Sequence, residues 1–179
     1  MLTMILALML PAADAAFWAN LQPLCGKAFE GRVLEAPPGD TTFAGQRLVM
    51  HVRECSADTI RIPFHVGTDR SRTWVLTRVG DRIRLKHDHR HEDGSEDTVT
   101  QYGGDSRPGG SATALEFPAD AQTIGLIPAA KTNVWTVEVD PTGHRFVYAL
   151  RREGTDRRFR IAFDTRTTVT APPPPWGSK

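Results

Sequence analysis

The chain of 179 residues lacks the short motifs that indicate the common enzyme classes. It contains no GxSxG elbow, no P-loop, no HExxH motif and no dinucleotide-binding fingerprint, so nucleophilic and phosphoryl-transfer chemistry have no positive support. Its net charge is only +1, from 22 Lys and Arg against 21 Asp and Glu. This balance gives no general attraction to nucleic acid or to an anionic membrane, so a charged partner must be recognised locally.

Cysteine is scarce as well. The sequence has two cysteines, Cys25 and Cys55, and no CxxC pair, which excludes a dithiol redox enzyme and a cysteine zinc ribbon. In an oxidising compartment we expect the two to form a disulfide, worth about 3 to 4 kcal/mol in the chain-entropy model. The alternative is a pair of buried free thiols.

The first sixteen residues, MLTMILALMLPAADAA, have no Lys or Arg ahead of their apolar run, although a signal peptide usually carries one. They match a signal peptide otherwise, because the run is too short to span a bilayer and the small residues of Ala13-Asp14-Ala15 suit cleavage near Ala15 or Ala16. We therefore expect residues 1–16 to be removed, leaving an exported protein without a transmembrane span. The alternative is an N-terminal core helix.

No helical period interrupts the sequence after residue 24, where apolar residues alternate with a period of two. Ten segments follow this pattern: 28–35, 46–54, 59–66, 71–79, 82–91, 96–102, 112–117, 132–139, 145–152 and 157–164. Because short turns join them, they predict an all-β, antiparallel up-and-down meander barrel over residues 17–170. A two-sheet sandwich is the alternative. We expect a short helical cap at 17–24, and a Pro-rich tail at 171–179 with Trp176 docked on the barrel wall.

An unusual run of histidines lies in the segment Arg82 to Asp97, RIRLKHDHRHEDGSED. His87, His89 and His91 share the strand face of Ile83 and Leu85, which indicates that they point inward. A two-residue turn at Gly80-Asp81 sets three pairs in register: Leu76 with Leu85, Trp74 with His87, and Arg72 with His89. By the same parity, His51 and His65 should lie on the outer surface.

Asp93-Gly94 is a strong type I′ hairpin signal that predicts the pairs on the other side of this strand. It places three residues opposite the histidines: Glu96 faces His91, Thr98 faces His89, and Thr100 faces His87. The inward set at one end of the barrel then combines imidazole, carboxylate and hydroxyl groups. A ligand-binding site is predicted from six of these residues: Arg72, Trp74, His87, His89, Thr100 and Tyr102.

Three functions suit this cluster. It could bind the anionic head group of a small molecule, with Trp74 covering an apolar tail. It could hold zinc or copper through His89, His91 and Glu96, as a metal-binding protein or a metal-dependent hydrolase. It could supply a haem ligand, which is less favoured. A structural polar network, as in an envelope protein, is the alternative. The leading prediction is a small-ligand-binding barrel without an assigned reaction.

Several segments resemble a family of exported bacterial proteins without an assigned activity: HVREC, IPFHVGTDRSRTWVLTR, LKHDHRHEDGSED, QYGG, FPAD, RRFRIAFD and PPPPWG. More loosely, the opening FWANLQPLCGKAFEGRV is similar to the start of lipocalin-like and fatty-acid-binding-like barrels. Both resemblances imply a barrel fold, and the first implies a periplasmic or secreted location. Neither implies a mechanism.

Overall fold

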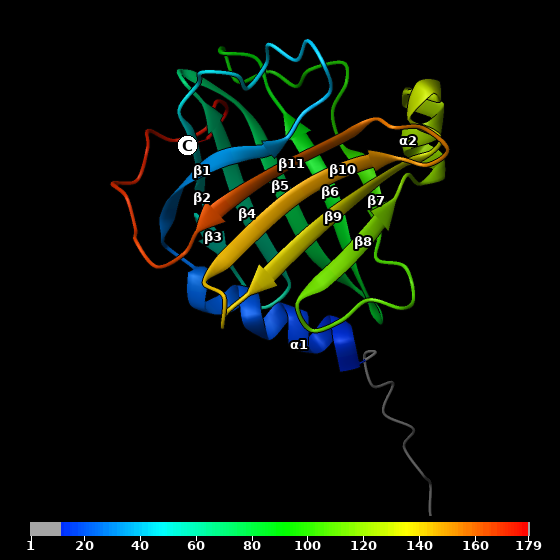
Figure 1. Ribbon diagram of the computed structural model, residues 1–179, viewed down its shortest axis with the longest axis horizontal. Helices are drawn as coiled ribbons and strands as arrows, with labels where there is room; N and C mark the ends of the chain where they lie inside the picture. Colours follow the sequence, from blue (N-terminus) through cyan, green and yellow to red (C-terminus); the bar gives the residue numbers. More distant parts are fainter. Residues whose placement is uncertain (1–11, 179) are drawn as a thin grey trace, which may run out of the picture.

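The computed structural model describes residues 12–178, which form a nearly closed antiparallel barrel (Figure 1). Helix α1 (Ala12–Leu21) and a 3₁₀ turn, η1 (Gln22–Leu24), precede the first strand. The eleven strands are β1 (Ala28–Glu35), β2 (Leu48–His51), β3 (Glu54–Cys55), β4 (Thr59–Val66), β5 (Asp69–Val79), β6 (Arg82–His89), β7 (Tyr102–Asp105), β8 (Ala114–Pro118), β9 (Asn133–Asp140), β10 (Arg145–Arg152) and β11 (Arg158–Asp164). A short helix, α2 (Ala121–Leu126), and a second 3₁₀ turn, η2 (Pro128–Ala130), lie between β8 and β9.

The sheet order is β7-β6-β5-β4-β2-β1-β11-β10-β9-β8, with β3 attached to β4. Strands that follow one another in the chain are neighbours, and the first strand pairs with the last, so the predicted up-and-down meander barrel is confirmed. The predicted strand 46–54 is divided into β2 and β3. Strands β2 and β3 both pair with β4, and β7 and β8, at the two ends of the described sheet, do not pair in a ladder, which leaves a seam in the wall.

Helix α2 bridges this seam. The Thr123 hydroxyl donates to the carbonyl oxygen of Gly103 at 2.8 Å and accepts from the amide of the same residue at 2.7 Å. The backbone passes so closely that a Cβ on Gly104 would lie 1.8 Å from the carbonyl oxygen of Pro118, which explains the glycines. The expectation that no helix interrupts the strands was wrong here, because Asp120 caps the amide of Thr123 and starts a helix.

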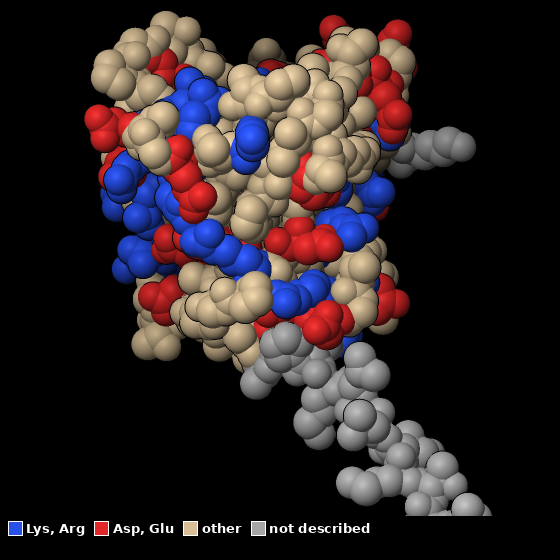
Figure 2. Space-filling view, turned by 90° about the vertical axis from the view of Figure 1, so that its right-hand side faces the viewer, with Lys and Arg blue, Asp and Glu red and all other residues tan. Residues whose placement is uncertain are grey.

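Ionic groups cover the outside of the seam. Arg84 pairs with Asp105, Lys86 with Asp120, and Arg107 with Glu116. Figure 2 shows this face of the molecule, where basic and acidic side chains are interleaved rather than separated by sign. Such exposed pairs contribute little stability individually, and they leave no large surface of one charge on this face.

The core lies inside the barrel, and α1 closes the end that lies at the bottom in Figure 1. The helix buries Phe17, Trp18 and Leu21 against inward residues of the strands. Burial of each large apolar side chain is worth roughly 1.5–3 kcal/mol. The opposite end of the barrel carries the loops around residues 36–47 and 90–101 and remains the open end.

Helix α1 starts five residues before the expected cap, and a buried carboxylate fixes it. Asp14 is only 4% exposed and accepts hydrogen bonds from the Ile83 amide, at 3.2 Å, and from the Ser106 hydroxyl. The predicted cleavage near Ala15 or Ala16 would remove this carboxylate. The apolar part of the predicted signal peptide, residues 1–11, lies outside the described residues.

The disulfide between Cys25 and Cys55 is present, as predicted, and joins the segment between η1 and β1 to β3. The Pro-rich tail runs over the outer wall, where the Trp176 amide donates to the Arg70 carbonyl at 3.1 Å. Under this tail His65 is 4% exposed. The prediction that His65 lies on the surface was therefore wrong, because the outer face of β4 is covered by a segment distant in sequence. Among the described residues, no helix is long and apolar enough to cross a membrane.

Candidate ligand pocket at the open end of the barrel

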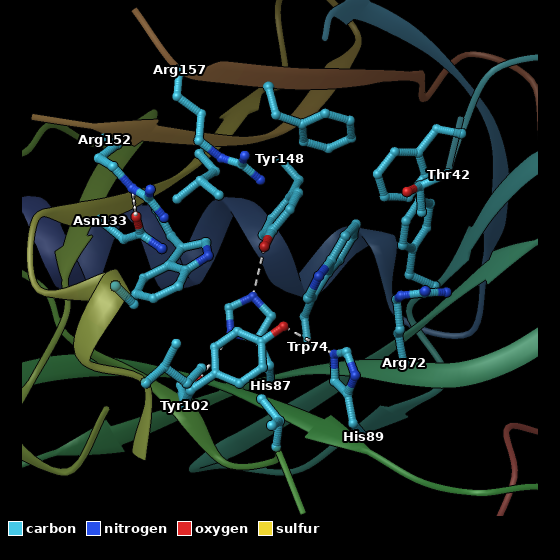
Figure 3. A pocket seen from close by; sticks show the side chains of 18 of the residues that line it. Thr42, Arg72, Trp74, His87, His89, Tyr102, Asn133, Tyr148, Arg152 and Arg157 are labelled. Atoms are coloured by element: carbon cyan, nitrogen blue, oxygen red, sulfur yellow. Dashed lines mark hydrogen bonds between the residues drawn. The ribbon is translucent and has the colours of Figure 1, made fainter. Parts of the chain in front are cut away.

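A cavity of about 380 Å³ opens at the end of the barrel opposite α1. Strands β5, β6, β9 and β10 provide its walls, and the segments 37–43, 97–99 and 152–158 surround its mouth. Figure 3 shows its side chains converging from opposite walls. The volume falls in the range of pockets that enclose small organic molecules.

The β5–β6 hairpin positions the predicted part of the pocket. Its register pairs Arg72 with His89, Trp74 with His87 and Leu76 with Leu85, as the Gly80-Asp81 turn predicts. Because side chains alternate across a strand, this register directs His87 and His89 to the inside with Leu85. Four of the six predicted ligand-binding residues therefore line the cavity on this hairpin, and Tyr102 of β7 lines it as well.

His87 forms the polar centre of the pocket floor. Its Nδ1 lies 2.9 Å from the carbonyl oxygen of Tyr102, and its Nε2 lies 2.7 Å from the hydroxyl of Tyr148. A carbonyl oxygen only accepts, so Nδ1 carries the proton, Nε2 is an acceptor, and the Tyr148 hydroxyl donates to it. Burial lowers the pKa of His87 to about 3. The ring is neutral at ordinary pH, and neither nitrogen is free to bind a metal.

Tyr102 and His89 form a second polar pair beside it. The Tyr102 hydroxyl lies 3.1 Å from Nε2 of His89. Burial raises the pKa of Tyr102 to about 12, and burial followed by the charge of Arg72 lowers the pKa of His89. Both side chains are consequently uncharged near neutral pH, and the floor presents neutral hydrogen-bonding groups.

Aromatic rings line the rest of the cavity. The Tyr148 ring stacks on Trp74 with centroids 4.2 Å apart, and Trp74 in turn stacks on Phe64 at 4.8 Å. Trp135 lies on the other side of His87, with ring centroids 5.3 Å apart. These tryptophans are 2% exposed, so strand packing holds them in place, and they give the cavity flat apolar walls.

Arginines gather at the mouth. Arg72, Arg152, Arg157 and Arg158 line the cavity, against two aspartates, Asp40 and Asp97. Arg72 already forms an ion pair with Asp69. Arg152 donates through Nε to the side-chain oxygen of Asn133 at 3.1 Å.

The structure does not bring the predicted metal ligands together. The turn at Asp93–Gly94 forms, but Arg90 rather than His91 faces Glu96. This register differs by one residue from the predicted hairpin, which was therefore wrong, and a shift of one moves side chains to the opposite face. His91 is exposed and Glu96 pairs with Arg90 at 3.0 Å. Among residues 12–178, no group of three His, Cys, Asp or Glu could hold a metal ion.

A second difference in register, of two residues, explains the position of Thr100. Strand β6 ends at His89, residues 96–101 form no strand, and His87 pairs with Tyr102 instead of Thr100. The Thr100 hydroxyl accepts from the amide of His89 at 2.8 Å. It thus supports the end of β6 and does not line the cavity.

The sequence analysis missed several contributors to the pocket, among them Trp135, Tyr148, Arg152 and Arg157. Trp135 and Tyr148 stand at inward positions of predicted strands, so the sequence predicts that they point into the barrel. It does not predict that they contact His87 from the opposite wall. Arg152 and Arg157 flank the turn at residues 153–156, in a charged run that indicates solvated side chains equally well.

The fold and site together define an antiparallel β-barrel with an aromatic pocket at its open end. Comparisons with protein-family models, with curated proteins and with solved structures find no match for this chain. The functional argument therefore depends on the geometry of the pocket itself.

Proposed function

We propose that this protein binds a small, largely apolar organic molecule in the pocket at the open end of the barrel. The observation that carries the proposal is the aromatic wall of Trp74, Trp135 and Tyr148 around a cavity of about 380 Å³. A folded core normally fills such space. Preformed apolar cavities with a few fixed polar groups are typical of small-molecule sites.

The polar groups of the floor favour the same class of ligand. His87, Tyr148, Tyr102 and His89 hydrogen-bond mainly to one another or to backbone. A ligand therefore need not supply many polar atoms to replace lost hydrogen bonds, and flat rings can stack on the tryptophans. Because these histidines are neutral, the floor suits a hydroxyl, a carbonyl or an apolar edge rather than an ion.

We further propose that binding takes place outside the cytoplasm, in the periplasm or after secretion. The Cys25–Cys55 disulfide supports this location, since disulfides persist in oxidising compartments. Cell fractionation with an antibody against the protein tests it: we expect the protein in the extracytoplasmic fraction, and its retention in the cytoplasm would contradict the proposal.

Binding is tested directly with N-phenyl-1-naphthylamine, an uncharged dye of two ring systems that fluoresces in apolar surroundings. Titration of the folded protein should give saturable fluorescence with one site per chain. The blocking variant is Leu150→Trp, at a half-buried position that lines the cavity. We expect at least tenfold weaker binding, because the larger ring occupies the ligand's space.

The matched control is Val79→Trp, which adds the same ring at an exposed position outside the cavity. It should leave the affinity for the dye within twofold of the unmodified protein. Absence of saturable binding, or an equal loss of affinity in Leu150→Trp and Val79→Trp, would show that the dye does not enter this pocket and would refute the proposed function.

A further inference from the structure

Arg152 and Arg157 at the pocket mouth differ from most arginines of the barrel, because neither has an ionic partner among the described residues. On the walls, Arg84 pairs with Asp105, Arg151 with Glu116, and Arg160 with Glu138. The Arg157 side chain makes no hydrogen bond or ion pair within residues 12–178, and Arg152 uses only its Nε, toward Asn133. Several guanidinium N–H groups at the mouth therefore remain available to a ligand.

The geometry of these two side chains directs them to one place. Arg152 ends β10 and Arg157 precedes β11, so the turn between the strands holds them close together. Figure 3 shows the Arg157 side chain extending toward Tyr148, on the side of the pocket where Asn133 orients Arg152. Arg158, which also lines the cavity, adds a third positive charge.

The other cationic candidates do not replace them. Arg72 is neutralised by Asp69, and His87 and His89 are uncharged because burial lowers their pKa values. The acids near the mouth are Asp40 and Asp97 on the lining, and Glu153 and Asp156 within the turn. Glu153 pairs with Arg107 and Arg151, outside the cavity. None of these four acids forms an ion pair with Arg152 or Arg157 within the described part of the chain.

We infer that the ligand carries an acid group, such as a carboxylate, sulfonate or phosphate, that binds Arg152 and Arg157 at the mouth while its apolar body lies between the tryptophans. This inference rests on the proposed function and adds the ligand's charge and orientation. Guanidinium groups suit such anions because their planar donors match two oxygens of the acid. The ligand class is therefore an amphipathic organic anion that enters with its apolar end first.

A pair of dyes tests the charge separately from the binding. 1-Anilinonaphthalene-8-sulfonate has the ring body of N-phenyl-1-naphthylamine and adds one sulfonate. We expect the sulfonated dye to bind the unmodified protein more tightly than the neutral dye. The variant Arg157→Gln should weaken its binding about tenfold, the scale expected for a charge-assisted contact, and should leave binding of the neutral dye within twofold.

The control is Arg32→Gln, which removes one positive charge from an exposed residue of β1, away from the cavity. It should change neither affinity by more than twofold. The inference is overturned if Arg32→Gln and Arg157→Gln lose equal affinity for the sulfonated dye, or if the unmodified protein does not bind the sulfonated dye more tightly than the neutral one. In either case the proposed function stands. Failure of both dyes to bind refutes the proposed function itself.

Discussion

The buried carboxylate of Asp14 provides a quantitative test of how α1 is held to the barrel. Asp14 accepts from the Ile83 amide and the Ser106 hydroxyl. In Asp14→Ala the Ile83 amide keeps a partner, because it also lies 3.2 Å from the Ser106 hydroxyl oxygen. Only the Ser106 hydroxyl then loses its acceptor. The net loss is therefore close to one buried charge-assisted hydrogen bond, which is worth about 2 kcal/mol.

The assay is urea unfolding with the disulfide intact. For a chain of this size the slope is about 2 kcal/mol per molar urea, so Asp14→Ala should lower the midpoint by about 1 M. The control is Asp156→Asn at an exposed carboxylate without a side-chain partner in the described residues, which should change stability by less than about 0.5 kcal/mol. An Asp14→Ala midpoint equal to that of the control would refute the reasoning.

The same experiment bears on processing of the chain. Cleavage after Ala15 or Ala16, as the sequence predicts, removes Asp14 from the folded protein. A shortened chain that starts at Phe17 should then be at least as unstable as Asp14→Ala, because it loses the same hydrogen bonds and the first turn of α1.

Three further predictions concern the scaffold. Replacing Cys25 and Cys55 by serine should lower the free energy of unfolding by about 3.6 kcal/mol, from a loop separation of 30 residues; a loss under about 1 kcal/mol contradicts this. Gly104→Ala should destabilise the seam by more than about 3 kcal/mol, because its Cβ would collide with β8. Gly125→Ala meets nothing within 4 Å and lies in α2, where alanine is the better helix former, so it should not lower the melting temperature. Burial lowers the pKa of His65 from 6.5 to about 4, so between pH 6.5 and 4 the unfolded chain binds more protons than the folded protein. The free energy of unfolding should therefore fall on acidification, by up to about 1.4 kcal/mol per pH unit. His65→Gln should flatten this decline, and identical pH profiles of the variant and the unmodified protein would contradict this prediction.

The barrel and half of its pocket were predictable because their signals are local. The Gly80-Asp81 turn and the match of Leu76 with Leu85 fixed the β5–β6 register, and with it the inward facing of His87. The Asp93-Gly94 signal predicted a real turn but the wrong pairing, since the chain leaves the ladder after His89. A one-residue difference was sufficient to move Glu96 from the pocket to the outer face.

The rest of the site depends on contacts that no local pattern contains. Tyr148 meets His87 across the barrel although the two are 61 positions apart in the sequence, and their contact is set by barrel closure rather than by either strand. The cover over His65 comes from the tail, whose Trp176 binds the backbone of Arg70. Period-two facing identifies the inner and outer surfaces of a strand, but it does not reveal what later packs against them.

A crystal structure of the protein with N-phenyl-1-naphthylamine is the most direct test of the central claim. We predict the dye inside the open end of the barrel, with its rings against Trp74 and Trp135 and an edge toward the Tyr148 hydroxyl. Dye bound only to the outer wall, with the cavity between these tryptophans free of it, would contradict the account.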